Sequence, residues 1–229
     1  MRSAGPVQRW LAVAVLAAPP LGACTGSLFQ SKVAPAATYL LAPAAVAGVA
    51  APTARAAGGG TLIPADLAVL KPRVRAGLET DRIAVLYPDH RLDYFADARW
   101  SGPLAEALQD AAVQVLHERA QLRGVSGDAS VFASGYWLEL EVSDFQAEYA
   151  AGAEPPTVHV RLMGRLGSSA DRGILDRFVV EAREPAAANR LTEIVAAYSR
   201  AAGAALGEIA ARATATLANG GPAREAAAR

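Results

Sequence analysis

Few residues in this chain have the types and spacing of a catalytic or metal-binding site. The three histidines, His90, His117 and His159, fall on an expected turn, helix and strand, without an i,i+4 pair or a neighbouring cysteine, so the spacing of a zinc site is absent. The stretch "GVSGD" (124–128) lacks the Gly-x-Ser-x-Gly order of a serine nucleophile, and no glycine-rich nucleotide-binding motif occurs. We therefore expect no catalytic residue, metal or cofactor, and a hydrolase is the least favoured alternative.

The single cysteine, Cys24, has clearer chemistry because of what precedes it. Arg2 and Arg9 are the only charged residues among the first 31, and residues 10–18 ("WLAVAVLAA") form a continuous apolar run. About nine apolar residues are too few to span a bilayer, which takes roughly 20. A basic start, a short apolar run and small residues before a cleavage point are typical of a secretory signal peptide. We expect residues 1–23 to be that signal.

Four residues at the expected cleavage point, Leu21, Gly22, Ala23 and Cys24, resemble the lipobox of bacterial lipoproteins. The resemblance implies cleavage before Cys24, a diacylglycerol on its sulfur and acylation of the new amino end. Several acyl chains anchor a protein durably, whereas one holds it only marginally. The next residue is Thr25, and the absence of aspartate there implies transfer to the outer membrane. The alternative is a cysteine that follows an ordinary signal peptide by chance.

The charge balance excludes some classes of partner. The chain has 22 Lys and Arg against 22 Asp and Glu, so its net charge is zero, and no basic excess would attract nucleic acid or an anionic membrane surface. No second apolar stretch reaches the length of a membrane span. If Cys24 is acylated, no thiol remains for a disulfide, and packing alone stabilises the fold.

Composition also divides the chain into segments. Residues 24–37 are small and polar and are expected to form a tether. Residues 42–60 are rich in Ala, Pro and Gly, and their prolines and triple glycine oppose a helix, so we interpret them as a disordered insertion. The folded body is then 38–218, followed by a flexible tail at 219–229.

The first half of the body predicts strands and then a helix. The strand candidates are 38–41, 66–74, 82–88 and 92–95, with a turn at 88–91 between the last two. From Trp100, apolar residues recur at spacings of three and four up to about Arg123, which predicts a helix. Asp97 or Ser101 is its expected N-cap, and Pro103 suits its first turn.

Apolar and charged residues alternate in the next part of the chain, which predicts strands. The candidates are 136–145, 157–166 and 174–182. One antiparallel register of the first two strands pairs apolar residues with apolar ones and acids with bases. Its pairs are Leu140 with Val160, Val142 with Val158, Glu139 with Arg161, and Glu141 with His159.

A final amphipathic helix is expected at 187–218, where Gly203 and Gly207 should weaken its middle. The order is strands, helix, three strands, helix. This order predicts an α/β (α+β) two-layer sandwich, in which one mixed or antiparallel sheet is covered on one face by two long helices.

Four stretches carry a resemblance to a known family when they are taken together and in order. They are "YLL" (39–41), "ETDRIAVLYPDHRLDYFADARWSGPLAEAL" (79–108), "LEVSDFQ" (140–146) and "NRLTEIVAAYSRAAGAAL" (189–206). They resemble the ABC-type transport auxiliary lipoprotein family, the PqiC-like lipoproteins of MCE-type transport systems. The matching positions, which are expected to be mostly structural, are Asp81, Arg82, Ile83, Tyr94, Arg99, Trp100, Pro103 and Leu104.

The resemblance implies a non-enzymatic role in the cell envelope. A lipoprotein of this kind joins an MCE-domain protein and an inner-membrane ABC permease and ATPase in moving lipids or other apolar molecules. Because some relatives assemble into rings, the resemblance also allows a homo-oligomer. The alternative function is that of a structural envelope lipoprotein, which assists assembly of an outer-membrane complex or tethers the membrane to peptidoglycan.

Some of these side chains could contact a partner instead of the core. Trp137 lies on the face of its strand opposite Leu138 and Leu140, so Trp137 and Phe145 would form an exposed partner or lipid surface if no helix covers that face. Trp100 is expected to lie in the core. Arg82 and Arg99 are expected to form structural ion pairs with Asp97 or Asp93 in preference to binding a ligand.

Overall fold

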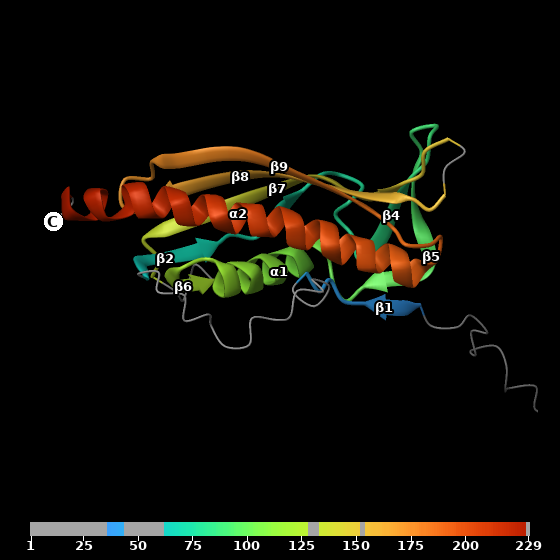
Figure 1. Ribbon diagram of the computed structural model, residues 1–229, viewed down its shortest axis with the longest axis horizontal. Coiled ribbons are helices and arrows are strands. Elements are labelled where there is room, and N and C mark those ends of the chain that lie inside the picture. Colours follow the sequence, from blue (N-terminus) through green and yellow to red (C-terminus); the bar gives the residue numbers. More distant parts are fainter. Residues whose placement is uncertain (1–35, 44–61, 128–132, 152–153, 228–229) are drawn as a thin grey trace, which may run out of the picture. The chain divides into compact units, whose positions relative to one another are not determined.

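Strand β7 (Tyr136–Glu148) is the central strand of one nine-stranded sheet (Figure 1). Along one edge it pairs antiparallel with β8 (Thr157–Ser168). Its other edge pairs in turn with three parallel strands, β2 (Ile63–Val69), β3 (Arg73–Val74) and β4 (Arg82–Leu86). The chain therefore follows the length of β7 before it reaches the hairpin that begins with β4.

The remaining strands extend the sheet on both sides. Strand β9 (Ile174–Pro185) pairs antiparallel with β8, and β5 (Leu92–Trp100) pairs antiparallel with β4. Two short parallel strands complete the sheet, β1 (Ala37–Tyr39) beside β5 and β6 (Leu122–Ser126) beside β2. The sheet is therefore mixed, as expected.

The computed structural model describes residues 36–43, 62–127, 133–151 and 154–227. The expected signal peptide, the lipobox with Cys24, most of the tether and most of the insertion lie outside these residues. The segment boundaries proposed for them stay predictions.

Two helices pack on the sheet, α1 (Leu104–Arg119) and the much longer α2 (Leu191–Ala227). In Figure 1, α2 crosses β8 and β9, with α1 beside it. The fold is α+β as expected, but only one of the helices is long. Helix α2 also begins at Leu191 and not at 187, and it continues through most of the segment that was expected to be a flexible tail.

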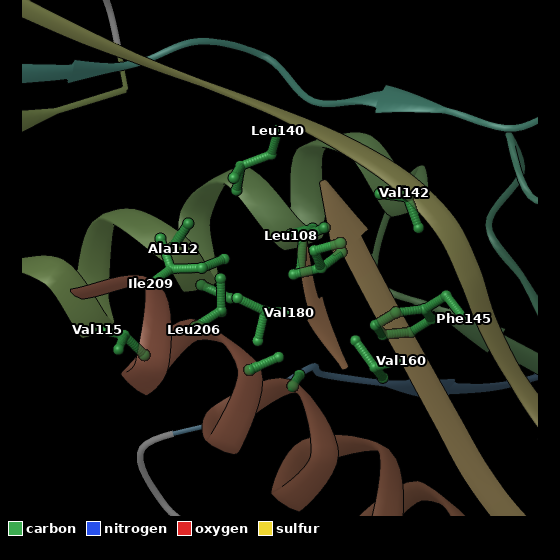
Figure 2. Close-up of a cluster of buried hydrophobic side chains, with 14 of the residues drawn as sticks. Leu108, Ala112, Val115, Leu140, Val142, Phe145, Val160, Val180, Leu206 and Ile209 are labelled. Carbon is green, nitrogen blue, oxygen red and sulfur yellow. The ribbon is translucent and has the colours of Figure 1, made fainter. Parts of the chain in front are cut away.

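The core lies between the sheet and both helices, where apolar side chains from distant parts of the chain meet (Figure 2). It includes Leu108 and Val115 of α1, Leu140 of β7, and Leu206 and Ile209 of α2, all at most 1% exposed. Leu108 and Val115 lie on the inward face predicted for the first helix, and Leu206 and Ile209 on the one predicted for the last helix. The inward face predicted for β7 is correct as far as Val142.

The register predicted for β7 and β8 is wrong. Leu140 lies opposite Gly164 and Val142 opposite Leu162, so the observed pairing is offset by four residues from the predicted one. Because four is an even number, the apolar face remains the inward face up to Val142. Ser143 is then an extra residue, a β-bulge, and the alternation reverses beyond it.

Because of this bulge, the prediction that Phe145 lies on an exposed surface is wrong. After Ser143, Phe145 and Ala147 point into the core, whereas Asp144 and Gln146 turn to the opposite face. Phe145 is 1% exposed, so it is no part of an exposed surface. Its ring packs against Trp100 and Tyr198, with ring centroids 6.2 and 5.2 Å away.

The start and end of the first helix also differ from the prediction. Trp100 is buried as expected, but it ends strand β5, and α1 begins at Leu104 after Pro103. No side chain caps α1 at this end, so the N-cap predicted at Asp97 or Ser101 is wrong. The helix ends at Arg119, and the residues that were expected to finish it lead into β6. The strand predicted at 66–74 is divided into β2 and β3.

Candidate functional site

The family-motif residues meet at one corner of the fold, where β5 ends and α1 begins. The Trp100 N–H donates to the Asp81 carbonyl oxygen over 2.6 Å, and the Leu104 N–H donates to the Thr80 carbonyl oxygen over 3.0 Å. The second bond satisfies an N–H at the first turn of α1, which helices otherwise leave unpaired. An ion pair of 3.7 Å between Arg99 and Asp81 lies beside these bonds.

Side chains of the same motif fix β4 against β5. The Arg82 guanidinium lies 4.2 Å from the centre of the Tyr94 ring, and the Tyr94 hydroxyl donates to the Gly77 carbonyl oxygen over 2.6 Å. Ile83, Trp100 and Leu104 are buried in the core. These motif residues therefore hold β4, β5 and the start of α1 together, and we call this arrangement the structural corner.

The ion-pair partners predicted for the two motif arginines are wrong. Arg99 pairs with Asp81, and Arg82 stacks on an aromatic ring. Asp93 pairs with Arg91, at 3.3 Å. Asp97 is an exposed residue of β5 with φ 52°.

The three histidines are separate, as the sequence analysis expected. His90 lies on the exposed turn between β4 and β5, and His117 is exposed on α1. Within the described ranges, no three His, Cys, Asp or Glu side chains are arranged to hold a metal ion.

His159 belongs to a network on the sheet face opposite the helices, which we call the outer face. The prediction that His159 pairs with Glu141 is wrong. The Nδ1 atom lies 2.9 Å from a Glu148 oxygen and the Nε2 atom 3.0 Å from a Glu181 oxygen. Arg183 lies 2.9 Å from Glu148 and 3.1 Å from Glu181. We call this network the outer polar cluster. It consists of Asp144, Gln146, Glu148, His159, Glu181 and Arg183.

The cluster favours the ionised form of Glu148. Partial burial alone would raise the pKa of this carboxyl group, but hydrogen bonds from His159, Gln146 and Arg183 outweigh burial and hold the pKa below its ordinary value. His159 is 6% exposed, because these side chains surround it. The cluster is a set of paired charges that joins β7, β8 and β9.

Trp137 lies on the outer face, as the sequence predicted. It is partly buried, its indole N–H donates to the Ser168 carbonyl oxygen over 3.3 Å, and its ring lies across Gly167 of β8. Gly167 has no side chain to displace the ring, so the indole lies flat against the sheet. Trp137 stays a candidate for a partner surface.

Two adjoining hollows extend from Trp137 across the outer face. The larger has a volume of about 810 Å³, and its lining includes Ala68, Leu70, Trp137 and Arg172. The second has a volume of about 420 Å³ and is lined in part by the exposed apolar residues Met163 and Val179. Because Glu139 lines both hollows, we treat them as one feature, the outer groove. Its charged lining residues are Arg73, Glu139, Glu141, Arg165, Arg172 and Arg177.

Sequence reasoning found Trp137 but missed the rest of the outer groove. The signal was present, because Met163 and Val179 occupy outward positions of β8 and β9 between positions that carry charged side chains, Arg161 and Arg165 on β8 and Arg177 and Glu181 on β9. Apolar residues on an otherwise polar strand face, at neighbouring positions of two strands, indicate a local surface feature.

The helices of the described residues include no membrane-span candidate, because none combines the required length with sufficient hydropathy.

Comparison with known structures supports the fold. A protein of Xanthomonas campestris, of the family model DUF330, is similar at a TM-score of 0.63 and 22% identity, over 69% of this chain and 88% of that chain. An uncharacterized protein is similar at a TM-score of 0.56 and 16% identity, over 66% and 94%. A PelC dodecamer from Paraburkholderia phytofirmans is less similar, with a TM-score of 0.37 and 12% identity over 64% of this chain and 86% of that chain, and it adds nothing to this support.

No curated protein matches the chain. A family model does match it, over residues 39–210, and its description is ABC-type transport auxiliary lipoprotein component. The matched range begins in β1 and ends within α2, so it includes every strand from β2 to β9 and the structural corner described above. The chain therefore belongs to the family of ABC-type transport auxiliary lipoprotein components.

Proposed function

We propose that this protein is a non-enzymatic auxiliary subunit of an ABC transporter that works with an MCE-domain protein to move lipids or other apolar molecules across the cell envelope. The observation that carries the proposal is the family match over 39–210, which covers the folded body. The family-motif residues agree with the match, because they form the hydrogen bonds and core contacts of the structural corner within the matched range.

The proposal includes a lipid anchor at Cys24, in the outer membrane and facing the periplasm. The lipobox and Thr25 support this location, and the polar residues 24–37 lead from the anchor to β1 at Ala37. Metabolic labelling with palmitate tests the anchor. The chain should incorporate label and Cys24→Ala should not, whereas equal labelling of both would refute it.

The partners are tested by affinity purification of the lipidated protein from crosslinked cell envelopes. An ABC permease, its ATPase and an MCE-domain protein should be recovered with the chain and be lost with Cys24→Ala. Recovery of an outer-membrane assembly complex or peptidoglycan in their place would favour the structural alternative. The mass of the purified lipidated protein in detergent tests whether it forms a homo-oligomer, which we also propose.

A further inference from the structure

The outer groove combines an apolar floor with a positive lining. Trp137 and Leu70 line its larger part, and Met163 and Val179, which are 36% and 47% exposed, line the smaller part. The lining carries four arginines and two glutamates, hence a net charge of +2, although the whole chain has no net charge. Both volumes are in the range of small-molecule sites.

One arginine of the groove lies in an unfavourable position. Arg177 of β9 is directly opposite Arg165 of β8, and like charges in such a pair destabilise a sheet. Arg165 forms an ion pair with Glu139, which also contacts Arg73 at 2.7 Å. Arg177 is exposed and has no acidic partner within the part of the chain that the structure describes. An anion bound beside Arg177 would offset this repulsion.

The hydrogen bonding of the sheet indicates what kind of anion fits. Strands β7 and β8, which cross the middle of the groove, are paired along both edges, whereas β9 at its border pairs only with β8. A peptide that lay over β7 and β8, between Trp137 and Met163, would therefore gain no main-chain hydrogen bonds from them, and those bonds supply the affinity when a strand is added to a sheet. A molecule with an apolar body and one anionic head group needs only apolar contacts and a contact with arginine, and the groove lining provides both.

We propose that the outer groove binds an anionic amphiphile, with its head group at Arg177 and Arg165 and its alkyl body over Trp137 and Leu70. As a statement about transported cargo, this proposal rests on the proposed function, but binding itself is measured on the isolated protein. Failure of binding would leave the partner experiment above unaffected, and the reverse also holds.

Trp137 provides a direct readout of binding. The chain has tryptophans at 10, 100 and 137, and Trp100 is only 2% exposed. In the full chain carrying Cys24→Ala and Trp10→Phe, a bromine-labelled dodecyl phosphate below its micelle concentration should quench the fluorescence of Trp137 saturably. The quenching should disappear when Trp137→Phe is added, which leaves the signal of Trp100.

Two variants and two further probes test the assignment of the head group. Arg177→Gln should raise the Kd for the phosphate by about tenfold or more, because a charge-assisted contact is lost. Arg161→Gln, an exposed arginine of the same face outside the groove lining, should change it less than about twofold. Equal effects of the two variants, equal quenching by a dodecyl ammonium probe with the same label, or full displacement by an acidic peptide would each overturn the proposal.

Discussion

The hydroxyl of Tyr198 in α2 donates a 2.5 Å hydrogen bond to the carbonyl oxygen of Ala84 in β4. The two residues are 114 positions apart in the sequence, so this bond joins the last helix to the hairpin of the family motif. Tyr198 is fully buried, and burial raises the pKa of its phenol group well above the usual range, so the hydroxyl keeps the proton that it donates.

Removing this hydroxyl should destabilise the fold without changing its shape. Tyr198→Phe keeps the ring against Trp100 and Phe145 but leaves the buried Ala84 carbonyl without this donor. The free energy of unfolding should fall by about 1–3 kcal/mol, measured by urea denaturation with an unchanged m-value.

Tyr149→Phe is the matched control. The Tyr149 hydroxyl also donates a short hydrogen bond, 2.6 Å to Asn189, but this bond is exposed to solvent. Its loss should cost less than about 0.5 kcal/mol. Equal losses from the two variants would show that burial of the Tyr198 bond has no special effect.

The elements of the body could largely be predicted from the sequence, because their inward faces repeat at the helix or strand period. Trp100 shows where this reasoning fails. Trp100 ends β5, and Leu104 is the first buried residue of α1. Both residues face the same core, and their spacing of four is also the spacing of a helical turn. The periodicity therefore continued across a boundary that Pro103 marks.

The register of β7 and β8 could not be predicted, because it depends on two features of the folded sheet. One is the extra residue at Ser143. The other is the close packing of the Trp137 ring over Gly167, which lies opposite it on β8. The predicted pairing matched apolar residues with each other and took no account of this ring contact. The outer groove could not be predicted for a similar reason, because residues of five strands, β2, β3, β7, β8 and β9, line it together.

Gly164 is expected to tolerate no side chain. A Cβ atom at this position would overlap the Phe178 ring, which packs across the strand. Gly164→Ala should lower the free energy of unfolding by about 1–3 kcal/mol, measured by urea denaturation. Gly135→Ala, at a position with open space around it, should stay within about 0.5 kcal/mol of the unchanged protein. In a Phe178→Leu background the Gly164→Ala penalty should shrink, and an unchanged penalty would contradict the ring contact.

The two glycines of α2 should respond to alanine with opposite signs. Alanine is favoured over glycine within a helix by about 1 kcal/mol. At Gly207 an added Cβ would meet the end of the Arg119 side chain, which can move, so Gly207→Ala should stabilise the protein by up to that amount. At Gly203 the Cβ would lie 2.7 Å from the carbonyl oxygen of Pro43, a backbone atom. Gly203→Ala should therefore give no gain and a net loss.

Thermal unfolding of the two variants side by side decides this prediction. Gly207→Ala should unfold above the unchanged protein and Gly203→Ala below it. Equal increases would show that residues 41–43 do not pack on α2 in solution, despite the 3.4 Å hydrogen bond from the Ala42 N–H to Ser199.

The outer polar cluster should make stability depend on acid pH through Glu148. A carboxyl group whose pKa is lower in the folded state than in the unfolded state stabilises the fold above its unfolded pKa, here near 4.5. That contribution is lost as the pH falls through the lower folded value. Glu148→Gln removes it, along with the ionic contacts to His159 and Arg183.

The difference in unfolding free energy between the unchanged protein and Glu148→Gln should therefore be largest near neutral pH and shrink as the pH falls below about 4.5. Urea denaturation at a series of pH values from ~7 to ~3 measures it. Both proteins keep the other side chains of the outer polar cluster, so the difference reports on Glu148 and its contacts. A difference that stayed constant over this range, or grew toward acid pH, would show that the hydrogen bonds of the cluster do not lower the pKa of Glu148.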